Sequence, residues 1–216
     1  MHVRVNAATS VDGKLASRRR EQVRLSGPED FERVDRLRAD HDAVMVGVGT
    51  VLADDPSLTV DDPDLVAARE DRGESPQPAR VVADSRGRTP PDARILSGAA
   101  PTYLLVGGDA AVDPLRTEGV TVVRTDGRRV DLAAGLAALE ERGVERLMVE
   151  GGGELLFSLF AADLVDELSV YVAPTVIGGR DAPTLADGEG FVGEFPTLSL
   201  VDTERVDDGV LLRYEA

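Results

Sequence analysis

V-G-V-G-T-V-L-A-D-D-P-S-L-T-V, residues Val46–Val60, is the stretch that decides the fold. It begins within an apolar run, Ala43–Val48, which predicts a buried strand. It then continues through glycine and threonine to the adjacent carboxylates Asp54 and Asp55. A buried strand that ends in such a turn is typical of α/β proteins, which bind ligands at the carboxyl ends of parallel strands. An Asp-Pro turn whose carboxylates only cap the backbone accounts for the same residues. Both interpretations stay open on this segment alone.

Strand-like and helix-like segments alternate on both sides of this stretch. Further strands are expected at Val3–Ala8, Arg80–Ala83, Tyr103–Val106, Val120–Val123, Arg146–Val149 and Glu167–Ala173. Helices are expected from Pro28, across Val130–Arg142 and across Glu154–Ala162. This order predicts an α/β protein with a mostly parallel central sheet and helices on both faces. The closing segments Thr197–Val206 and Val210–Tyr214 flank Asp207–Gly209 and predict a C-terminal antiparallel hairpin.

We expect one domain over residues 1–216, since the chain shows no internal repeat, low-complexity tract or linker. Residues 61–79 are polar and contain Pro-Gly punctuation. They predict a surface loop insertion with a short helix rather than a domain boundary.

Composition excludes several classes of function. The net charge is −16 with 42% hydrophobic residues, so the chain should fold while repelling nucleic acid and anionic membranes. It has no run long enough to span a membrane and no signal-peptide core, which predicts a cytoplasmic location. The absence of cysteine excludes disulfides, thiol catalysis and cysteine-bound zinc. His2 and His41 lack metal-ligand spacing, so we expect no metal site and assign both to surface or capping positions.

Lys14 is the only lysine, and every other cation is an arginine. Acid excess with so little lysine favours a protein from a salt-rich cytoplasm, because at about 1 M salt the Debye length of ~3 Å screens self-repulsion. An ordinary acidic protein from a GC-rich genome is the alternative. The retained lysine, in S-V-D-G-K, indicates a need for a compact ammonium, although chance explains one residue equally.

Two further strand ends carry features of phosphate binding. In L-M-V-E-G-G-G-E-L-L, Leu147–Leu156, three glycines follow Glu150 and precede a helix, whose N-terminus offers N–H groups and a positive dipole. A tight strand–helix turn is the alternative, and the spacing is not the Rossmann fingerprint. In A-D-S-R-G-R, Arg86 and Arg88 are suited to grip a phosphate, or else are solvated surface charges.

Four loops therefore follow strands: Ser10–Lys14, Gly47–Leu58, Asp84–Arg88 and Glu150–Glu154. In a parallel sheet these ends share one edge, so the loops are able to converge on one ligand. The residues alone thus predict a soluble enzyme that binds a phosphate-bearing nucleotide or cofactor.

A series of motifs then runs in order along nearly the whole chain: N-A-A-T-S-V-D-G-K, L-R-A-D-H-D-A-V-M-V-G-V-G-T-V-L-A-D-D-P-S-L-T-V, V-V-A-D-S-R-G-R-T-P, V-D-L, L-M-V-E-G-G-G-E-L, D-L-V-D-E-L-S-V-Y-V-A-P and G-G-R-D-A-P-T. The series resembles the riboflavin-biosynthesis reductase family, above all its stand-alone archaeal and fungal members. The resemblance implies a dihydrofolate-reductase-like fold, a homodimer and NADPH as cofactor, with NADH as a substitute. It also implies reduction of the ribosyl side chain of 2,5-diamino-6-ribosylamino-4(3H)-pyrimidinone 5′-phosphate to the ribitylamino compound. Without cysteine the chain is not expected to deaminate this pyrimidine through zinc.

The resemblance also implies roles for individual residues. Lys14, Asp54 and Glu150 are the implied catalytic residues. The implied cofactor-binding residues are Ala8, Thr50, Asp54, Ser85, Arg86, Gly87, Arg88, Gly151, Gly152, Gly153 and Glu154. The implied substrate-binding residues are Lys14, Arg38, Leu58 and Glu150.

One position departs from the family pattern. The residue after L-T-V is often basic in the family, but here it is Asp61, so Arg38 or one of Arg18–Arg20 is the expected substitute at the substrate phosphate. Two other functions remain open: a dihydrofolate-type reductase of another small molecule, and a non-catalytic NADP-binding module.

Overall fold

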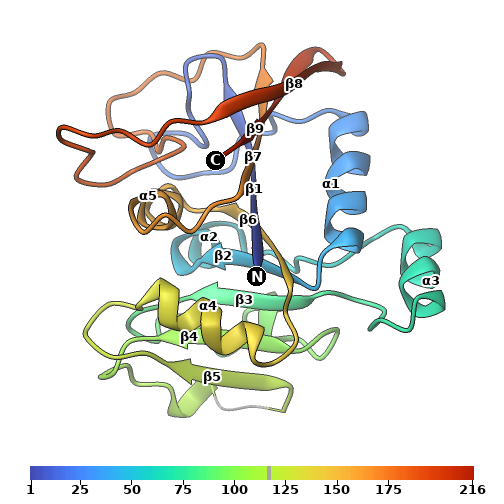
Figure 1. Cartoon of the computed structure of the whole chain (residues 1–216), viewed down its shortest axis with the longest axis vertical. Helices are drawn as coiled ribbons and strands as arrows, with labels where there is room; N and C mark the ends of the chain where they lie inside the picture. The colour runs from blue at the N-terminus through green and yellow to red at the C-terminus, as the bar shows by residue number, and fades with distance from the viewer. Residues whose placement is uncertain (116–117) are drawn as a thin grey trace. The chain divides into compact units, whose positions relative to one another are not determined.

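The computed structural model describes residues 1–115 and 118–216, and the chain forms two compact units (Figure 1). The first contains Met1 and Val34–Met148, and the second contains His2–Arg33 and Val149–Ala216. Helix α1 (Pro28–Asp40) and strand β6 (Arg146–Gly151) each contribute residues to both units. The single domain expected over the whole chain stays a prediction.

Four parallel strands in the order β5-β4-β3-β2 form the sheet of the first unit. They are β2 (Ala43–Gly47), β3 (Ala79–Ala83), β4 (Thr102–Val106) and β5 (Val120–Arg124). The register places Val46 beside Val82 and Val82 beside Leu104, all at most 1% exposed. Such continuous apolar strands are typical of a parallel sheet covered on both faces.

Helices and short 3₁₀ turns surround this sheet. They are α2 (Val48–Asp54), α3 (Pro63–Asp71), α4 (Leu132–Glu140), η1 (Arg94–Leu96) and η2 (Asp113–Leu115). Val48 and Val51 of α2 join the buried cluster formed by Val46, Val82 and Leu104. Helix α4 packs on the other face, where Gly135 lies so close to Leu105 that a Cβ would stand 3.0 Å from its Cδ1. The expected covering of both faces is confirmed for this unit.

The second unit contains β1 (His2–Ser10), β7 (Glu167–Ala173), β9 (Gly209–Glu215) and β8 (Ser199–Val206), adjacent in that order, together with helix α5 (Gly153–Ala161). Strands β1 and β7 are parallel, whereas β9 is antiparallel to both β7 and β8. The predicted C-terminal hairpin is therefore confirmed. Its core includes Tyr171 and Leu211, and Gly209 lies so close to Tyr171 that a Cβ would be 2.5 Å from the ring.

The turn of this hairpin caps helix α1. The Asp207 carboxylate accepts hydrogen bonds from the backbone N–H groups of Glu29 at 3.2 Å and Asp30 at 3.0 Å. A carboxylate at a helix N-terminus satisfies free donors and interacts favourably with the helix dipole. Gly27 leaves room for it, since a Cβ there would meet Asp207 at 2.4 Å.

Two sequence-based strand ends need correction, and the open assignment of His41 is decided. Strand β2 ends at Gly47, so Val48 and Thr50 belong to α2 rather than to a turn, because a helix lets Val48 and Val51 share one buried face. Strand β6 continues through Glu150. His41 is 5% exposed, and its Nδ1 lies 2.6 Å from the Leu37 carbonyl oxygen near the end of α1, which agrees with the capping position rather than the surface position.

The expected short helix within residues 61–79 is α3, and it is anchored by Arg69, which is only 2% exposed. In the part of the chain that the structure describes, no helix is long and apolar enough to cross a membrane.

Candidate active site

The acidic pair after β2 has two different roles. Asp55 adopts a left-handed conformation (φ 42°) at the end of α2, donates its N–H to the Val51 carbonyl at 3.0 Å, and accepts a hydrogen bond from the Arg94 N–H at 2.8 Å. It therefore serves the capping role that the sequence left open. Asp54 is the last residue of α2 and is exposed, and Thr50 lies one turn earlier.

The carboxylate of Asp54 has altered acidity. Although the residue is exposed, the protein around it partly desolvates the carboxylate and raises its pKa above the usual value. Desolvation disfavours the charged form of an acid. Asp54 is thus better suited than an ordinary surface carboxylate to hold a proton near a reacting group.

Leu58, Arg38 and Asp61 lie around the segment that follows. Leu58 has a φ of 54° and a side chain only 3% exposed, in the core of the first unit. Arg38 donates to the Thr59 carbonyl at 2.9 Å. The N–H of Asp61 donates to the Asp35 carboxylate at 2.9 Å. The segment is therefore bonded to α1 at Thr59 and at Asp61, and Asp61 adds negative charge at the position where the resemblance implied a basic residue.

The loop after β3 is built around a buried carboxylate. Asp84 is fully buried and accepts hydrogen bonds from the Thr89 N–H at 2.7 Å, the Thr89 hydroxyl at 2.8 Å and the Arg86 N–H at 3.3 Å. Arg88 lies 3.8 Å from the same carboxylate, with half of its side chain exposed. Asp84 therefore fixes the backbone while Arg86 and Arg88 stay at the surface.

Neighbouring loops hold this one in place. Ser85 Oγ accepts the Val130 N–H at 3.1 Å, and the Ser85 carbonyl accepts the Gly107 N–H at 3.2 Å. Gly87 has a φ of +70°, and a Cβ there would meet the Ala111 carbonyl oxygen at 2.4 Å. The loop is thus a tight backbone cradle that no larger residue at position 87 would fit.

The glycines after β6 have distinct structural reasons. Gly152 adopts φ 99° at the N-cap of α5, where no side chain caps the helix. Gly153 begins the helix, and a Cβ there would meet the Thr184 carbonyl oxygen at 2.5 Å. Gly151 closes β6, and Glu154 is exposed in the first turn. No side chain caps the α5 N-terminus, and anion binding there, which the glycine pattern indicated, stays a prediction.

Lys14 lies in the loop after β1, whose last residues include Ala8. Its ammonium donates to the Ala182 carbonyl at 3.3 Å, and its backbone pairs with Thr184. Thr184 in turn lies against Gly153. Within the second unit the structure therefore brings the Lys14 loop and the glycine loop together through residues 182–184.

The predicted site residues thus form two groups. The first unit carries Arg38, Thr50, Asp54, Leu58, Ser85, Arg86, Gly87 and Arg88, and the second carries Ala8, Lys14, Glu150, Gly151, Gly152, Gly153 and Glu154. Sequence reasoning missed Asp84, Thr184 and Asp187. Asp84 comes just before Arg86 and Arg88 in the sequence, and Thr184 is the last residue of the G-G-R-D-A-P-T motif. The sequence analysis gave neither residue a role of its own.

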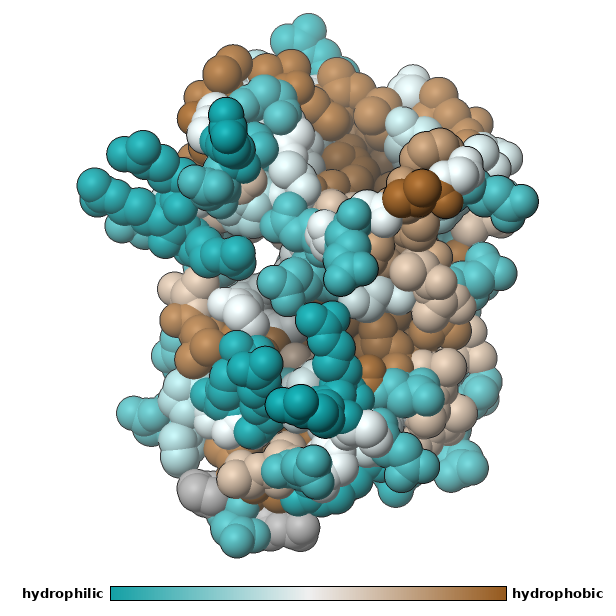
Figure 2. Space-filling view, turned by 90° about the vertical axis from the view of Figure 1, so that its left-hand side faces the viewer, coloured by the Kyte–Doolittle hydropathy of each residue, from teal (hydrophilic) through white to brown (hydrophobic). Residues whose placement is uncertain are grey.

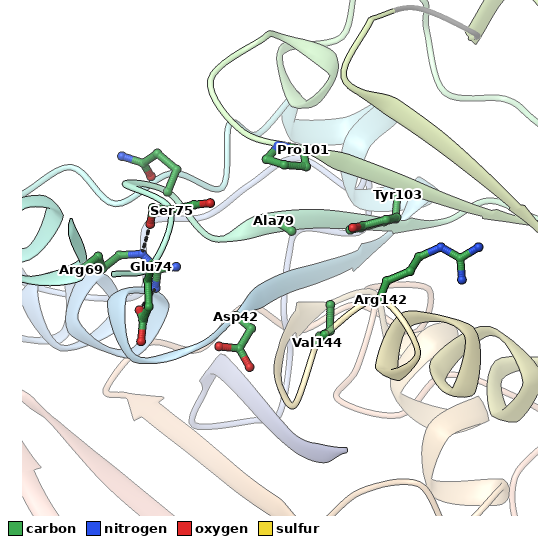
Figure 3. A pocket seen from close by; sticks show the side chains of 11 residues that line it. Asp42, Arg69, Glu74, Ser75, Ala79, Pro101, Tyr103, Arg142 and Val144 are labelled. Atoms are coloured by element: carbon green, nitrogen blue, oxygen red, sulfur yellow. Dashed lines mark hydrogen bonds and ion pairs between the residues drawn. The ribbon is translucent and has the colours of Figure 1, made fainter. Parts of the chain in front are cut away.

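A pocket of about 250 Å³ lies at the amino ends of the strands of the first unit (Figure 3). Asp42, Ala79, Pro101 and Tyr103 line it, and none of the predicted site residues does. It is therefore separate from the loops at the carboxyl ends of these strands.

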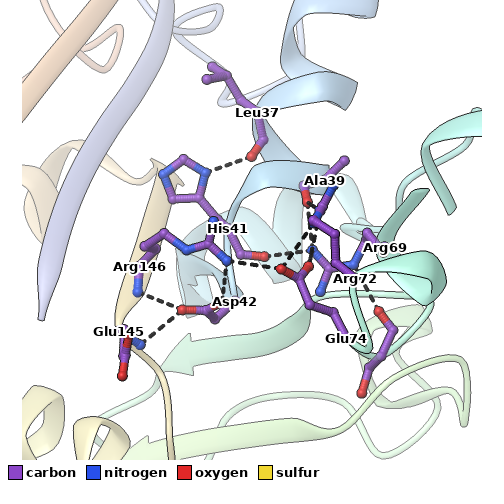
Figure 4. Close-up of polar contacts among 10 residues, drawn as sticks. Leu37, Ala39, His41, Asp42, Arg69, Arg72, Glu74, Glu145 and Arg146 are labelled. Carbon is purple, nitrogen blue, oxygen red and sulfur yellow. Dashed lines mark hydrogen bonds and ion pairs between the residues drawn. The ribbon is translucent and has the colours of Figure 1, made fainter.

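An ion-pair network, which includes the pocket residues Asp42, Arg69 and Glu74, lies beside the pocket (Figure 4). Arg69 donates to the carbonyls of Ala39, His41 and Ser75 at 2.7–2.9 Å and pairs with Glu74 at 3.3 Å. Arg146 pairs with Asp42 at 2.8 Å and with Glu74 at 3.3 Å. These contacts tie the 61–79 segment to the starts of β2 and β6.

Residues 1–212 match the family model described as the RibD C-terminal domain. The chain belongs to this family. It is 48% identical over 210 residues to the 2,5-diamino-6-ribosylamino-4(3H)-pyrimidinone 5′-phosphate reductase of Archaeoglobus fulgidus, covering 96% of this chain and 94% of that protein. Its identity to the protein of the same name from Methanothermobacter thermautotrophicus is 47% over 192 residues, covering 88% and 85%.

The fold of the family agrees with that of the chain. A crystal structure of a pyrimidine reductase-like protein from Corynebacterium diphtheriae matches 99% of this chain and 91% of its own length with a TM-score of 0.86 at 19% identity. The expected dihydrofolate-reductase-like α/β fold, with its mostly parallel strands and C-terminal hairpin, is therefore confirmed.

Proposed function

We propose that the chain is a reductase of riboflavin biosynthesis that reduces the ribosyl side chain of 2,5-diamino-6-ribosylamino-4(3H)-pyrimidinone 5′-phosphate. The observation that carries this proposal is the 48% identity that extends over nearly the full length of both this chain and a relative of that name. Relatives named RibD also match over 56% of their length, but their identities of 36% and 33% are lower, which favours the archaeal reductases as the functional counterpart.

We propose NADPH as the cofactor, with NADH as a weaker substitute. The residues fit a dinucleotide phosphate: the N-terminus of α5, which no side chain caps, suits a pyrophosphate, and Arg86 and Arg88 suit a 2′-phosphate. Gly87 and Gly153 support the same assignment, since a Cβ at either would collide with backbone oxygen atoms that shape these loops. When bound, NADPH supplies the hydride that reduces C1′ of the substrate.

The chain's own groups then have defined tasks. The open imine form of the ribosylamine accepts a hydride better when protonated, so carboxylates near C1′ stabilise the positive charge. We assign this task to Asp54, whose raised pKa also favours proton transfer, and to Glu150. Lys14 offers an ammonium to the anionic substrate, and Arg38 lies on the substrate side, where the buried side chain of Leu58 leaves only its backbone to contribute. Thr50 and Ala8 lie on the cofactor side in this proposal.

The deciding experiment measures NADPH oxidation with three substrates under identical salt: the diaminopyrimidine, its deaminated counterpart and dihydrofolate. We expect a clear preference in kcat/KM for the diamino compound, because a site that pairs with the exocyclic amine leaves polar groups unsatisfied with a carbonyl. Preference for the deaminated compound would reverse the order of steps. Turnover of dihydrofolate alone favours the pterin-type alternative, and NADPH binding without turnover of any substrate favours the binding module.

We further propose a homodimer. Leu200 and Val201 of β8 are more than half exposed, as are Val192 and Phe195 in the segment before it. Hydrophobic side chains also gather among hydrophilic ones toward the top of Figure 2. Exposed apolar residues of this kind favour association. The proposed substrate is a phosphorylated metabolite, which favours a cytoplasmic location.

A further inference from the structure

The segment between β7 and β8 is joined by hydrogen bonds to the loop after β1. The Asp12 carboxylate accepts the backbone N–H of Gly178 at 2.7 Å and of Ile177 at 3.0 Å. These bonds, with one from Ser10, lower the pKa of Asp12 to about 2. The Leu15 N–H donates to the Pro183 carbonyl at 2.9 Å. One side of the segment is therefore fixed to the loop that carries Lys14.

The same segment is fixed on its other side to helix α5. The Asp187 N–H donates to the Gly153 carbonyl at 3.0 Å, at the first residue of the helix. Farther along, the rings of Phe157 and Phe191 lie 4.9 Å apart, and Gly188 approaches Phe157 so closely that a Cβ would overlap the ring. The segment thus connects the Lys14 loop with the N-terminus of α5.

One short turn makes this connection. A single oxygen of the Asp187 carboxylate accepts both the Thr184 N–H at 3.0 Å and the Thr184 hydroxyl at 2.6 Å. Thr184 also pairs with the backbone of Lys14, and its carbonyl oxygen lies against Gly153. Both residues are half-buried. Asp187 therefore fixes the conformation of the turn on which Lys14 and Gly153 both rest.

We infer that Thr184 and Asp187 are positioning residues for the reductase, which set Lys14 relative to the N-terminus of α5. This inference rests on the proposed function, in which Lys14 serves the substrate and the α5 N-terminus serves the pyrophosphate. The contacts with residues 177–184 fix where the Lys14 loop lies, and a misplacement of about 1 Å is enough to cost ~10²-fold in rate. The carboxylate acts here as a hydrogen-bond acceptor, and its charge is not required.

The test uses Asp187→Ala and Asp187→Asn, with Asp181→Ala as the matched control. Asparagine keeps an acceptor oxygen for Thr184 and removes the charge, whereas alanine removes both. Asp181 is an exposed carboxylate in the same segment, and within the described residues its carboxylate has no hydrogen-bond partner. Thr184→Val provides a second, nearly isosteric break of the hydroxyl bond in case Asp187→Ala does not fold.

Three kinds of measurement are made. Calorimetry gives the Kd of NADP⁺, steady-state kinetics give kcat and KM, and amide hydrogen exchange is followed at residues 153–157 without ligand. For Asp187→Ala we expect the Kd of NADP⁺ and the substrate KM to rise about five- to tenfold, the loss of one or two hydrogen bonds. Exchange at the start of α5 should accelerate, and Asp187→Asn should restore all three. A variant that only unfolds more easily would lower kcat and leave KM and Kd unchanged.

The inference is overturned if Asp187→Ala and Thr184→Val match Asp181→Ala in Kd, KM and exchange. It is equally overturned if Asp187→Asn is as impaired as Asp187→Ala, since charge rather than the acceptor would then matter. A failure of the proposed function is distinguishable, because the wild-type protein would then lack turnover while NADP⁺ binding and hydrogen exchange still report on the turn.

Discussion

Asp84 accepts two hydrogen bonds from Thr89, one from its backbone N–H at 2.7 Å and one from its hydroxyl at 2.8 Å, and both residues are at most 2% exposed. This pair closes the loop that carries Arg86 and Arg88. We expect Asp84→Ala to destabilise the protein by about 1–3 kcal/mol, because it leaves buried donors unsatisfied. It should also raise the KM for NADPH more than the KM for the substrate. Thermal unfolding and steady-state kinetics check both, with the exposed Asp92→Ala as control.

The double variant Arg86→Ala/Arg88→Ala should lose preference for NADPH over NADH. Guanidinium groups recognise a phosphate by charge-assisted hydrogen bonds, which NADH does not offer at the 2′ position. We expect the ratio of kcat/KM values for the two cofactors to fall by about tenfold or more, with activity on NADH retained. The replacement of the exposed Arg205 on β8 by alanine is a control for loss of charge. An unchanged ratio would place the 2′-phosphate elsewhere.

Lys14→Ala, Asp54→Asn and Glu150→Gln should each lower kcat/KM by about 10²-fold or more without lowering the unfolding midpoint. Asp54→Asn should also change the acid side of the pH profile. The raised pKa of Asp54 means that its carboxylate is lost on acidification at a higher pH than for an ordinary aspartate. Wild-type kinetics in all three variants would place the reacting end of the site on other residues.

The network around Glu74 predicts a pH dependence of stability. The hydrogen bond from Arg72 lowers the pKa of Glu74. At Asp42, desolvation raises the pKa, but the hydrogen bonds and the charge of Arg146 outweigh desolvation, so the pKa of Asp42 is lowered as well. A carboxylate whose pKa is lowered in the folded state stabilises the fold at pH values above its unfolded pKa, which is 4.5 for Glu74 and 3.8 for Asp42. This stability is lost as the pH falls through the folded-state pKa.

Urea unfolding between pH 6 and pH 3 measures this dependence. We expect Glu74→Gln to be less stable than the wild type at pH 6 and to lose less stability on acidification. The exposed Glu189→Gln is the control. Parallel curves for Glu74→Gln and the wild type would show that the network contributes nothing to the acid transition.

The net charge of −16 predicts that salt stabilises the fold. Ions screen the repulsion among excess carboxylates, so unfolding midpoints should rise along a KCl series up to molar concentrations. The same measurement with a non-ionic osmolyte shows how much of the rise comes from screening of charge and how much from exclusion of the solute from the protein surface. A flat or falling series rejects adaptation to a salt-rich cytoplasm.

Apolar runs were enough to locate the strands, because a sheet buried on both faces needs them. Strand β7 has the bounds expected from the sequence, Glu167–Ala173. Helix starts were less certain: α2 begins at Val48, where two glycines favoured a turn. Burial of the helix face outweighed the local preference of glycine.

Side-chain roles that depend on distant backbone were not readable. Asp187 matters through its contact with Gly153, and Asp84 through the return of the chain at Thr89. The motif V-V-A-D-S-R-G-R-T-P contains both Asp84 and Thr89, but the pattern does not show that the two side chains bond. The sequence left His41 between a surface and a capping position, and only the packing shows that it is 5% exposed beside the Leu37 carbonyl.

Arg124 clasps the loop after β4 by donating to the carbonyls of Gly107, Gly108 and Ala110, much as Arg69 clasps the chain around Ala39. A guanidinium donates to several carbonyls at once, whereas the compact ammonium of a lysine does not reach them all. Because the chain has no cysteine, these loops are held by non-covalent arginine contacts and not by disulfides. The loop after β4, beside the proposed cofactor site, therefore keeps its shape through reversible hydrogen bonds, which reducing agents leave intact and with which free guanidinium ions compete directly.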